Sequence, residues 1–262
     1  MMDDAPSPRE SARTSRAWAL AGLAAIVLAW QLTAQRLGPL LMATPLDALR
    51  AIGPLLDSGR FFPAAAASLM RAAIGISLGC TCGFALGLLA AHSPRLRGAL
   101  EPLRWLLMAI PSVVVVLLAM LWFGLGSAMV IFLAALMTAP GLYVNTVKGM
   151  AQVDRQLLEM THVYRFGFWL RLRHLYVPAL TAPLSAALLI AVNGGVRLVV
   201  MAEVLGADSG VGHALANARA TFDSSELYAW VLMILAFVGL LELALIQPLQ
   251  RRLGRWQEVR HA

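Results

Sequence analysis

The chain has 262 residues, of which 60% are hydrophobic and 13% are charged. Soluble domains carry about 25% charged residues, so this composition excludes an ordinary soluble domain, a disordered chain and a disulfide scaffold. The net charge of +7 does not indicate nucleic-acid binding, because the basic residues lie between apolar blocks and not along one solvated face. The sequence predicts an all-α membrane protein.

The apolar blocks predict six transmembrane helices that follow a polar tail over residues 1–16. The predicted spans are residues 17–34, 66–91, 103–123, 126–147, 179–201 and 227–248. We expect one transmembrane domain over residues 17–262, with its core at 60–250. The first span has features of a cleavable signal peptide, because basic residues precede a short apolar run. Residues 32–35 lack a small-x-small cleavage site, so we favour a retained span over a cleaved leader.

The basic residues predict the orientation of the spans, because Lys and Arg are retained in cytoplasmic segments. With the N-terminus inside, fifteen of the 21 cations lie in inner segments and four in outer ones. The fifteen are Arg9, Arg13, Arg16, Arg95, Arg97, Arg104, Lys148, Arg155, Arg165, Arg171, Arg173, Arg251, Arg252, Arg255 and Arg260. The opposite orientation inverts the bias, so we expect both termini to be cytoplasmic.

The second span carries four glycines at intervals of four residues, which places them on one helical face. They are Gly75, Gly79, Gly83 and Gly87. A stripe of small residues lets another helix approach closely, so we interpret it as a helix-packing face. Cys80 and Cys82 lie in the same span, and we interpret them as small residues of the membrane core and not as a redox or metal pair.

The sequence lacks the motifs by which a transporter captures energy on its own. Its one lysine, Lys148, follows no glycine-rich loop, so we expect no P-loop for ATP. The first four spans hold no interior carboxylate of the kind that couples transport to protons or sodium. The five histidines form no paired metal-ligand spacing, and no catalytic residue is predicted. We therefore expect another subunit to supply the energy.

Residues 148–178 form a long inner connection with a helical pattern. Val153, Leu157, Leu158 and Thr161 recur at helical spacing, and an aromatic and basic run follows from Tyr164 to Trp169. Pro178 opens the fifth span. A helix of this composition does not cross a bilayer. We expect it to lie on the cytoplasmic surface and to present a face to a partner or to lipid.

Residues 159–178, EMTHVYRFGFWLRLRHLYVP, resemble the cytoplasmic coupling loop of ABC importer permeases, which begins with Glu-Ala-Ala and ends nineteen residues later in Pro. The segments 68–79, 121–126, 145–154 and 202–212 are similar, in order and spacing, to the nitrate/sulfonate/taurine branch of that family. Together they cover roughly residues 44–250. The resemblance implies a type I importer fold and a multi-pass protein of the cell (inner) membrane.

The resemblance also implies partners and contacts. It implies a permease that works as a homodimer with two ATPase subunits, which bind the ATP and Mg²⁺, and with an extracytoplasmic substrate-binding protein. No cofactor is expected in this chain. Contacts to the ATPase are implied for Val153, Asp154, Leu157, Leu158, Glu159, Met160, Thr161, Arg165, Gly167 and Pro178. A stand-alone secondary transporter is the alternative, and a membrane scaffold that recruits a protein is a weaker one.

The chain departs from the family pattern in the coupling loop. The two alanines after the family's Glu are Met160 and Thr161, and the family's Gly six residues after the Glu is Arg165. A turn with positive φ favours Gly, so either the turn has moved to Gly167 or Arg165 accepts strain of about 1 kcal/mol.

Asn193 and Arg197 in the fifth span are the candidates for the translocation path. A buried Arg costs at least about 2.5 kcal/mol unless it is paired or hydrated, so Arg197 either faces the path or reaches the outer headgroups near Glu203. The resemblance implies a small anionic solute such as a sulfonate, taurine or nitrate. The branch also includes carriers of neutral or cationic vitamin precursors, so the sequence does not name the substrate.

Overall fold

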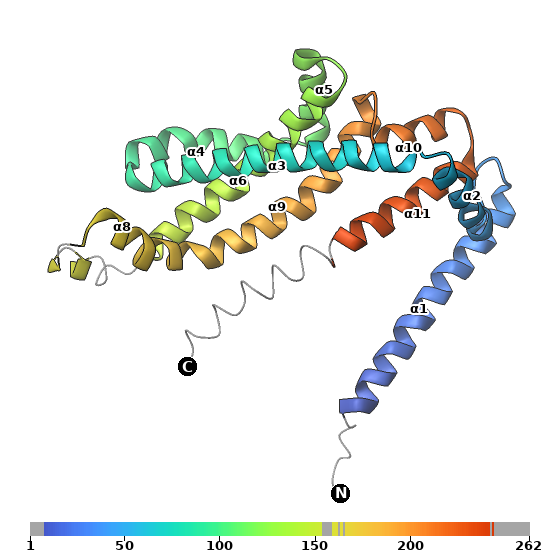
Figure 1. Ribbon diagram of the computed structural model, residues 1–262, viewed down its shortest axis with the longest axis horizontal. Helices are drawn as coiled ribbons and strands as arrows, with labels where there is room; N and C mark the ends of the chain where they lie inside the picture. The colour runs from blue at the N-terminus through green and yellow to red at the C-terminus, as the bar shows by residue number, and fades with distance from the viewer. Residues whose placement is uncertain (1–7, 154–158, 162, 165, 242, 244–262) are drawn as a thin grey trace, which may run out of the picture. The chain divides into compact units, whose positions relative to one another are not determined.

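The computed structural model describes residues 8–153, 159–161, 163–164, 166–241 and 243. Every regular element in these residues is helical, which confirms the predicted all-α class. The elements are α1 (Pro8–Leu37), α2 (Pro45–Asp57), α3 (Phe61–His92), α4 (Pro94–Ala109), α5 (Ser112–Phe123), α6 (Ser127–Ala151), α8 (Phe168–Arg171), the π-helix η1 (Leu172–Tyr176), α9 (Val177–Gly206), α10 (Val211–Ala220) and α11 (Ser224–Leu241) (Figure 1).

Four helical segments are long and apolar enough to cross a membrane by themselves. They are Trp18–Leu37, Phe61–His92, Ser127–Ala151 and Ala179–Gly206, and they match four of the predicted spans. The helices α4 and α5 form a fifth span only if they are taken together. The predicted span 227–248 begins in α11 and continues past the described residues, so the count of six stays a prediction.

The third predicted span, 103–123, is wrong as one continuous helix. The axes of α4 and α5 meet at 104°. Ile110 and Pro111, between them, adopt extended backbone with ψ of 130° and 134°. Pro111 lacks an N–H for the helical ladder, and its ring disfavours helical backbone at the residue before it. Apolar composition continues through this point, which is why hydropathy alone predicts one helix.

The chain divides into two compact units. The first comprises residues 1–59 and 217–233, and the second comprises residues 60–216 and 234–262. In the first unit, the indole Nε1 of Trp30 in α1 donates to the Ala43 carbonyl over 3.0 Å, and the Trp30 ring lies 5.4 Å from that of Tyr228. The Thr44 side chain caps α2 by accepting from the Asp47 amide at 3.2 Å.

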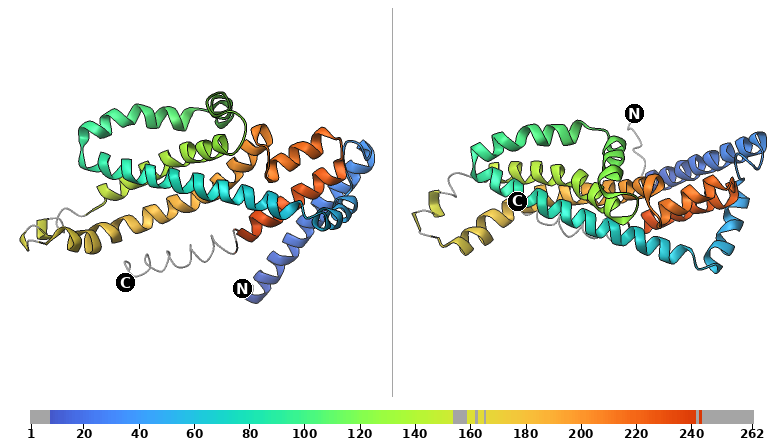
Figure 2. Two further views of the ribbon diagram at one scale, coloured as in Figure 1. Left: turned by 45° about the horizontal axis from the view of Figure 1, so that its top comes forward. Right: turned by 90° about the horizontal axis from the view of Figure 1, so that it is seen from above.

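The second unit is built on α3, α6 and α9, which lie side by side in all views (Figures 1 and 2). The glycine stripe of α3 faces α6. A Cβ at Gly75 would lie 2.6 Å from the Ala134 Cβ, and one at Gly87 would lie 2.6 Å from the Thr146 Cβ. A Cβ at Gly79 would overlap Thr138 Oγ1 and the Ala135 carbonyl. The absence of side chains on this stripe therefore sets how closely α3 and α6 approach.

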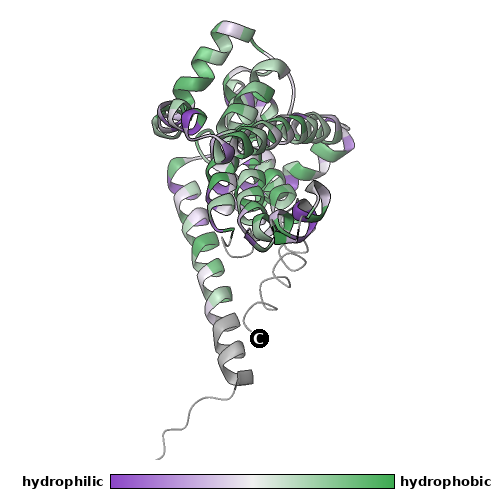
Figure 3. Ribbon diagram, turned by 90° about the vertical axis from the view of Figure 1, so that its left-hand side faces the viewer, coloured by the Kyte–Doolittle hydropathy of each residue, from purple (hydrophilic) through white to green (hydrophobic). Residues whose placement is uncertain are grey.

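Apolar residues predominate along the helices (Figure 3), and many of the large ones are exposed. Leu121 and Trp122 of α5 are 79% and 61% exposed, and Ile190 of α9 is 73% exposed. Large exposed side chains of this kind are stable in contact with lipid or another subunit, not with water. This agrees with the location in the membrane.

Candidate functional site

A buried ion pair joins α3 to the last turn of α9. Arg71 Nη1 lies 2.7 Å from Glu203 Oε1, and the two side chains are 3% and 0% exposed. The second carboxylate oxygen, Oε2, accepts from Ser68 Oγ at 2.6 Å and from the Gly212 amide at 3.1 Å. Each oxygen of the carboxylate thus has a donor, as a buried charge requires.

The remaining donors of Arg71 extend this cluster to two further segments. Arg71 Nε donates to Ser127 Oγ, at the start of α6, over 2.9 Å. Nη1 and Nη2 donate to the carbonyl and the hydroxyl of Ser209, both over 2.6 Å, and Asp208 Oδ1 lies 3.4 Å from Nη2. One guanidinium therefore connects α3, α6, α9 and the loop between α9 and α10.

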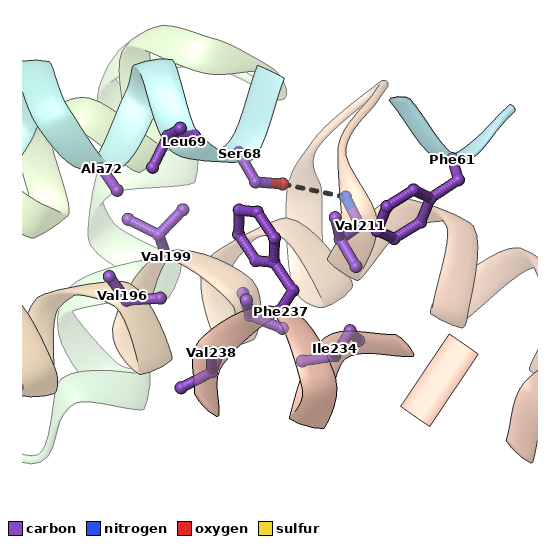
Figure 4. Close-up of a pocket in the computed structure, with 11 residues that line it drawn as sticks. Phe61, Ser68, Leu69, Ala72, Val196, Val199, Val211, Ile234, Phe237 and Val238 are labelled. Atoms are coloured by element: carbon purple, nitrogen blue, oxygen red, sulfur yellow. Dashed lines mark hydrogen bonds between the residues drawn. The ribbon is translucent and has the colours of Figure 1, made fainter. Parts of the chain in front are cut away.

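The glycines of that loop allow it to fold over the carboxylate. Gly210 has φ of +104°, and a Cβ there would overlap the Glu203 carboxylate. A Cβ at Gly212 would lie 2.7 Å from the Glu203 Cβ. The next amide, that of Val211, donates to Ser68 Oγ over 2.9 Å (Figure 4). The sequence GADSGVG at 206–212 is therefore a structural cap on Glu203.

This cluster is not among the sites predicted from the sequence. Glu203 is considered there as a neighbour of Arg197, whereas the structure pairs it with Arg71. The sequence does indicate that Arg71 has a partner, because an arginine inside an apolar span must be paired or hydrated. Its partner could not be chosen from one sequence, since the two residues lie 132 positions apart.

Beside the cluster, α3, α9 and α11 enclose an apolar pocket (Figure 4). Phe61 and Leu69 line one side, and Val199, Ile234 and Phe237 line the others. The cavity holds about 20 Å³, which is enough for one water-sized group and too small for a solute. We interpret it as a packing gap and not as a substrate site.

Two larger grooves flank α9. The α3–α9 groove, of about 440 Å³, is lined by residues that include Ala72, Ile76, Ser77, Cys80, Asn193 and Val196. The α6–α9 groove, of about 300 Å³, is lined by residues that include Ser112, Thr138, Gly141, Asn145, Ile190 and Gly194. Each is large enough for a small solute, whereas the pocket of Figure 4 is not.

The two path candidates from the sequence lie apart. Asn193 lines the α3–α9 groove. Arg197 is exposed on α9, next to Leu198 of the α6–α9 groove, and within the described part of the chain it has no hydrogen bond or ion pair. The neighbour considered for it, Glu203, is occupied by Arg71.

The predicted coupling residues are described in part. Val153 and Thr161 are 8% and 3% exposed, whereas Glu159 and Met160 are exposed. Pro178 lies in the first turn of α9. Asp154, Leu157, Leu158 and Arg165 fall outside the described residues.

The backbone between Thr161 and α8 shows whether the turn predicted with positive φ lies at Gly167. The Phe166 amide donates to the Thr161 carbonyl over 2.9 Å, a bond from i to i−5 that closes many helix C-termini. Gly167 is not in the left-handed region of φ, so the positive-φ turn has not moved there. Its carbonyl instead accepts from the amides of Leu170 and Arg171, both over 3.1 Å, and so begins α8.

Comparison with known proteins agrees with this fold. Residues 83–256 match the family described as the binding-protein-dependent transport system inner membrane component. The permease SsuC of Bacillus subtilis (strain 168), named for aliphatic sulfonates, is 30% identical over 216 residues, which cover 82% of this chain and 78% of that protein. The formylaminopyrimidine transport permease ThiX of Halalkalibacterium halodurans is 29% identical over 237 residues, covering 89% and 93% of the two chains.

Among solved structures, an inward-facing methionine ABC transporter, MetNI, has a TM-score of 0.65 to this chain. The match covers 78% of this chain and 98% of the other, at 14% identity, so it shows the fold and not the substrate. The predicted permease fold, the membrane location and the expectation of a transport subunit are confirmed. The chain belongs to the family of binding-protein-dependent transport system inner membrane components, the permeases of ABC importers.

Proposed function

We propose that this chain forms the translocation path of an ATP-driven importer for a small anionic solute, such as a sulfonate, taurine or nitrate. Family membership supports the role of an importer permease. The ATP-driven mechanism is supported by the segment between α6 and α9, in which Glu159 and Met160 are exposed while Thr161 is buried. One face of this segment is thus available to a partner, and the opposite face is anchored.

The helix α9 provides a mechanical connection from this segment to the outer end of the path. It runs without interruption from Val177 to Gly206, which corresponds to about 45 Å at 1.5 Å per residue. Its first residues follow the coupling segment, and Glu203 in its last turn holds Arg71 of α3. Movement of the segment by an ATPase would therefore move both ends of α9 and the cluster together.

The substrate class rests on Arg197 and on one relative. Arg197 is exposed in the membrane-spanning part of α9, where an unpaired cation is costly unless it faces water or an anion. The SsuC relative is named for aliphatic sulfonates, which are anions. The ThiX relative is named for a formylaminopyrimidine, so the family tolerates substrates of different charge. We infer from Arg197 that the substrate is an anion. Which anion is transported is then determined by the binding protein.

The complex that we infer contains a second copy of this chain, two ATPase subunits that bind ATP and Mg²⁺, and an extracytoplasmic binding protein. The exposed apolar faces support contact with lipid and another membrane subunit. In the apolar segment Trp18–Leu37 of α1, for example, only 6% of the most apolar stretch is buried within the chain. A permease with no P-loop in its sequence also requires a separate source of energy.

Reconstitution tests this proposal. The chain alone in liposomes should take up no taurine or methanesulfonate, either with or without a proton gradient. Addition of a partner ATPase and a binding protein should give uptake that requires internal ATP. Uptake driven by a proton gradient in liposomes that hold the chain alone would refute the ATP-driven function and favour a secondary transporter.

A further inference from the structure

The two grooves beside α9 differ in what surrounds them. The α3–α9 groove shares Leu69, Ala72, Val196 and Val238 with the apolar pocket of Figure 4, so one end of it runs into packed apolar side chains. The α6–α9 groove has Ser112 on its rim, directly after the break between α4 and α5.

Irregular backbone at membrane depth needs hydrogen-bonding partners. It is tolerated where it is buried in protein or lines a water-filled cavity. Pro111 at the break is exposed, and Ile110 and Ser112 on either side of it are half-buried, so this chain by itself does not enclose the backbone here. We therefore expect water in the groove that contains Ser112.

Two of the three glycines that line the α6–α9 groove, Gly141 and Gly194, indicate that it is kept wide. A Cβ at Gly141 of α6 or at Gly194 of α9 would meet no atom within 4 Å. Helix packing therefore does not require these glycines, in contrast to Gly75 or Gly87. A glycine inside a helix lowers helix stability by about 1 kcal/mol relative to alanine. What these two glycines provide in return is open space and accessible backbone in the groove.

Polar groups in the groove and at its end fit an anion. Asn145 uses one N–H to reach the Gly141 carbonyl at 2.9 Å, which leaves a second N–H on a half-buried side chain. Ser112 adds a hydroxyl. Ile190, Gly194 and Arg197 are exposed at spacings of four and three, so they share one face of α9. Arg197 thus lies one turn beyond Gly194 and next to Leu198, at the end of the groove that is nearer the C-terminus of α9.

We infer that the α6–α9 groove is the aqueous path of the transported anion, that Arg197 at its outer end sets the preference for negative charge, and that Asn145 and Ser112 donate to the oxyanion. This inference rests on the proposed importer function and adds the side of α9 on which the solute passes. It places Asn193, in the other groove, outside the path.

Thiol labelling of the full chain in membrane vesicles tests the choice of groove. The native Cys80 lies in the α3–α9 groove and serves as its probe in a Cys82→Ser background. In a Cys80→Ser/Cys82→Ser background, Ile190→Cys and Asn145→Cys probe the α6–α9 groove. Two water-soluble methanethiosulfonates are used, one with a sulfonate and one with a trimethylammonium group. Such reagents react with thiolates, which do not form in hydrocarbon.

We expect the thiols at positions 190 and 145 to react and Cys80 to stay unmodified. With rates normalised to a free thiol in solution, the sulfonate reagent should react at position 190 on the order of tenfold faster than the cationic one, since one nearby guanidinium attracts one reagent and repels the other. Arg197→Gln should abolish that ratio. Arg219→Gln, which removes an exposed cation from α10, should leave it unchanged.

The opposite results overturn the inference. Reaction at Cys80 without reaction at positions 190 and 145 would place the path in the α3–α9 groove. Reaction at 190 with no charge preference, or with a preference that survives Arg197→Gln, would remove the role of Arg197. These outcomes are separate from the importer function, which fails only if ATP-dependent uptake is absent. In uptake, Arg197→Lys should retain part of the rate and Arg197→Leu should lose most of it at equal membrane levels.

Discussion

The Arg71 guanidinium and the Glu203 carboxylate lie 2.7 Å apart, although the two residues are 132 positions apart in the sequence. Both side chains are buried, and each charged group has hydrogen bonds to several segments of the chain. Such a pair is strongly dependent on both members, because removal of one leaves a charge in a medium of low dielectric constant. The pair therefore acts as a fixed point between the N-terminal half of α3 and the last turn of α9.

Replacement of either member should destabilise the protein. We expect Arg71→Leu and Glu203→Gln each to lower the free energy of unfolding by up to about 3–5 kcal/mol, visible as a lower melting temperature in detergent. The double variant Arg71→Leu/Glu203→Gln should lose less than the sum of the single changes, because no charge is left buried. Asp208→Asn is the control, since the Asp208 side chain is 76% exposed and should matter little. Equal melting temperatures for Asp208→Asn and Glu203→Gln would contradict this account.

The glycine stripe makes a second prediction about stability. Gly79→Ala should force α3 away from α6, because the new Cβ overlaps Thr138 Oγ1 and the Ala135 carbonyl, and backbone cannot rotate aside. We expect a loss of about 1–3 kcal/mol, measured by thermal unfolding of the purified protein. Gly98→Ala in α4 is the matched control, since a Cβ there meets nothing within 4 Å. A Gly79→Ala protein as stable as the Gly98→Ala protein would show that the two helices do not pack in this way.

The sequence predicts features that depend on local composition and misses those that depend on distant contacts. The apolar blocks locate α3, α6 and α9 because each helix must present apolar side chains along its length. The break at Pro111 is missed as a consequence of the same rule, since hydropathy does not register a lost N–H. The Arg71–Glu203 pair and the separation of Asn193 from Arg197 depend on which helices are neighbours. A single sequence does not show which helices are neighbours.

Orientation in the membrane is a prediction from charge that reporter fusions can check. Fusions after Asp57 and Ser209 should report the outer side, and fusions after Arg97, Gln152 and Arg255 the inner side, because cations are concentrated in the inner segments. A phosphatase reporter and a fluorescent reporter should give opposite signals at every site. An outer location of the fusion after Gln152 would remove the coupling segment from the cytoplasm and with it the proposed contact with an ATPase.

Glu159 is the residue at which coupling and stability can be separated. It is exposed, whereas Thr161 two positions later is 3% exposed, so the side chain of Glu159 is available for contact and contributes little to the fold. We expect Glu159→Ala to melt within about 0.5 kcal/mol of the parent protein and to assemble normally. The ATPase activity that loaded binding protein stimulates should nevertheless fall several-fold, because the variant loses the contact through which we propose that closure of the ATPase moves α9.

Two variants complete that test. Glu101→Ala removes another exposed carboxylate, in α4 and outside the coupling segment, and should leave stimulated ATP hydrolysis unchanged. Thr161→Arg places a large charged side chain at a buried position and should lower the melting temperature as well as the stimulation. If Glu159→Ala were to lower stability and stimulation together, as expected for Thr161→Arg, Glu159 would be part of the fold of this segment. Loss of stimulation at unchanged stability identifies it as a contact to the ATPase.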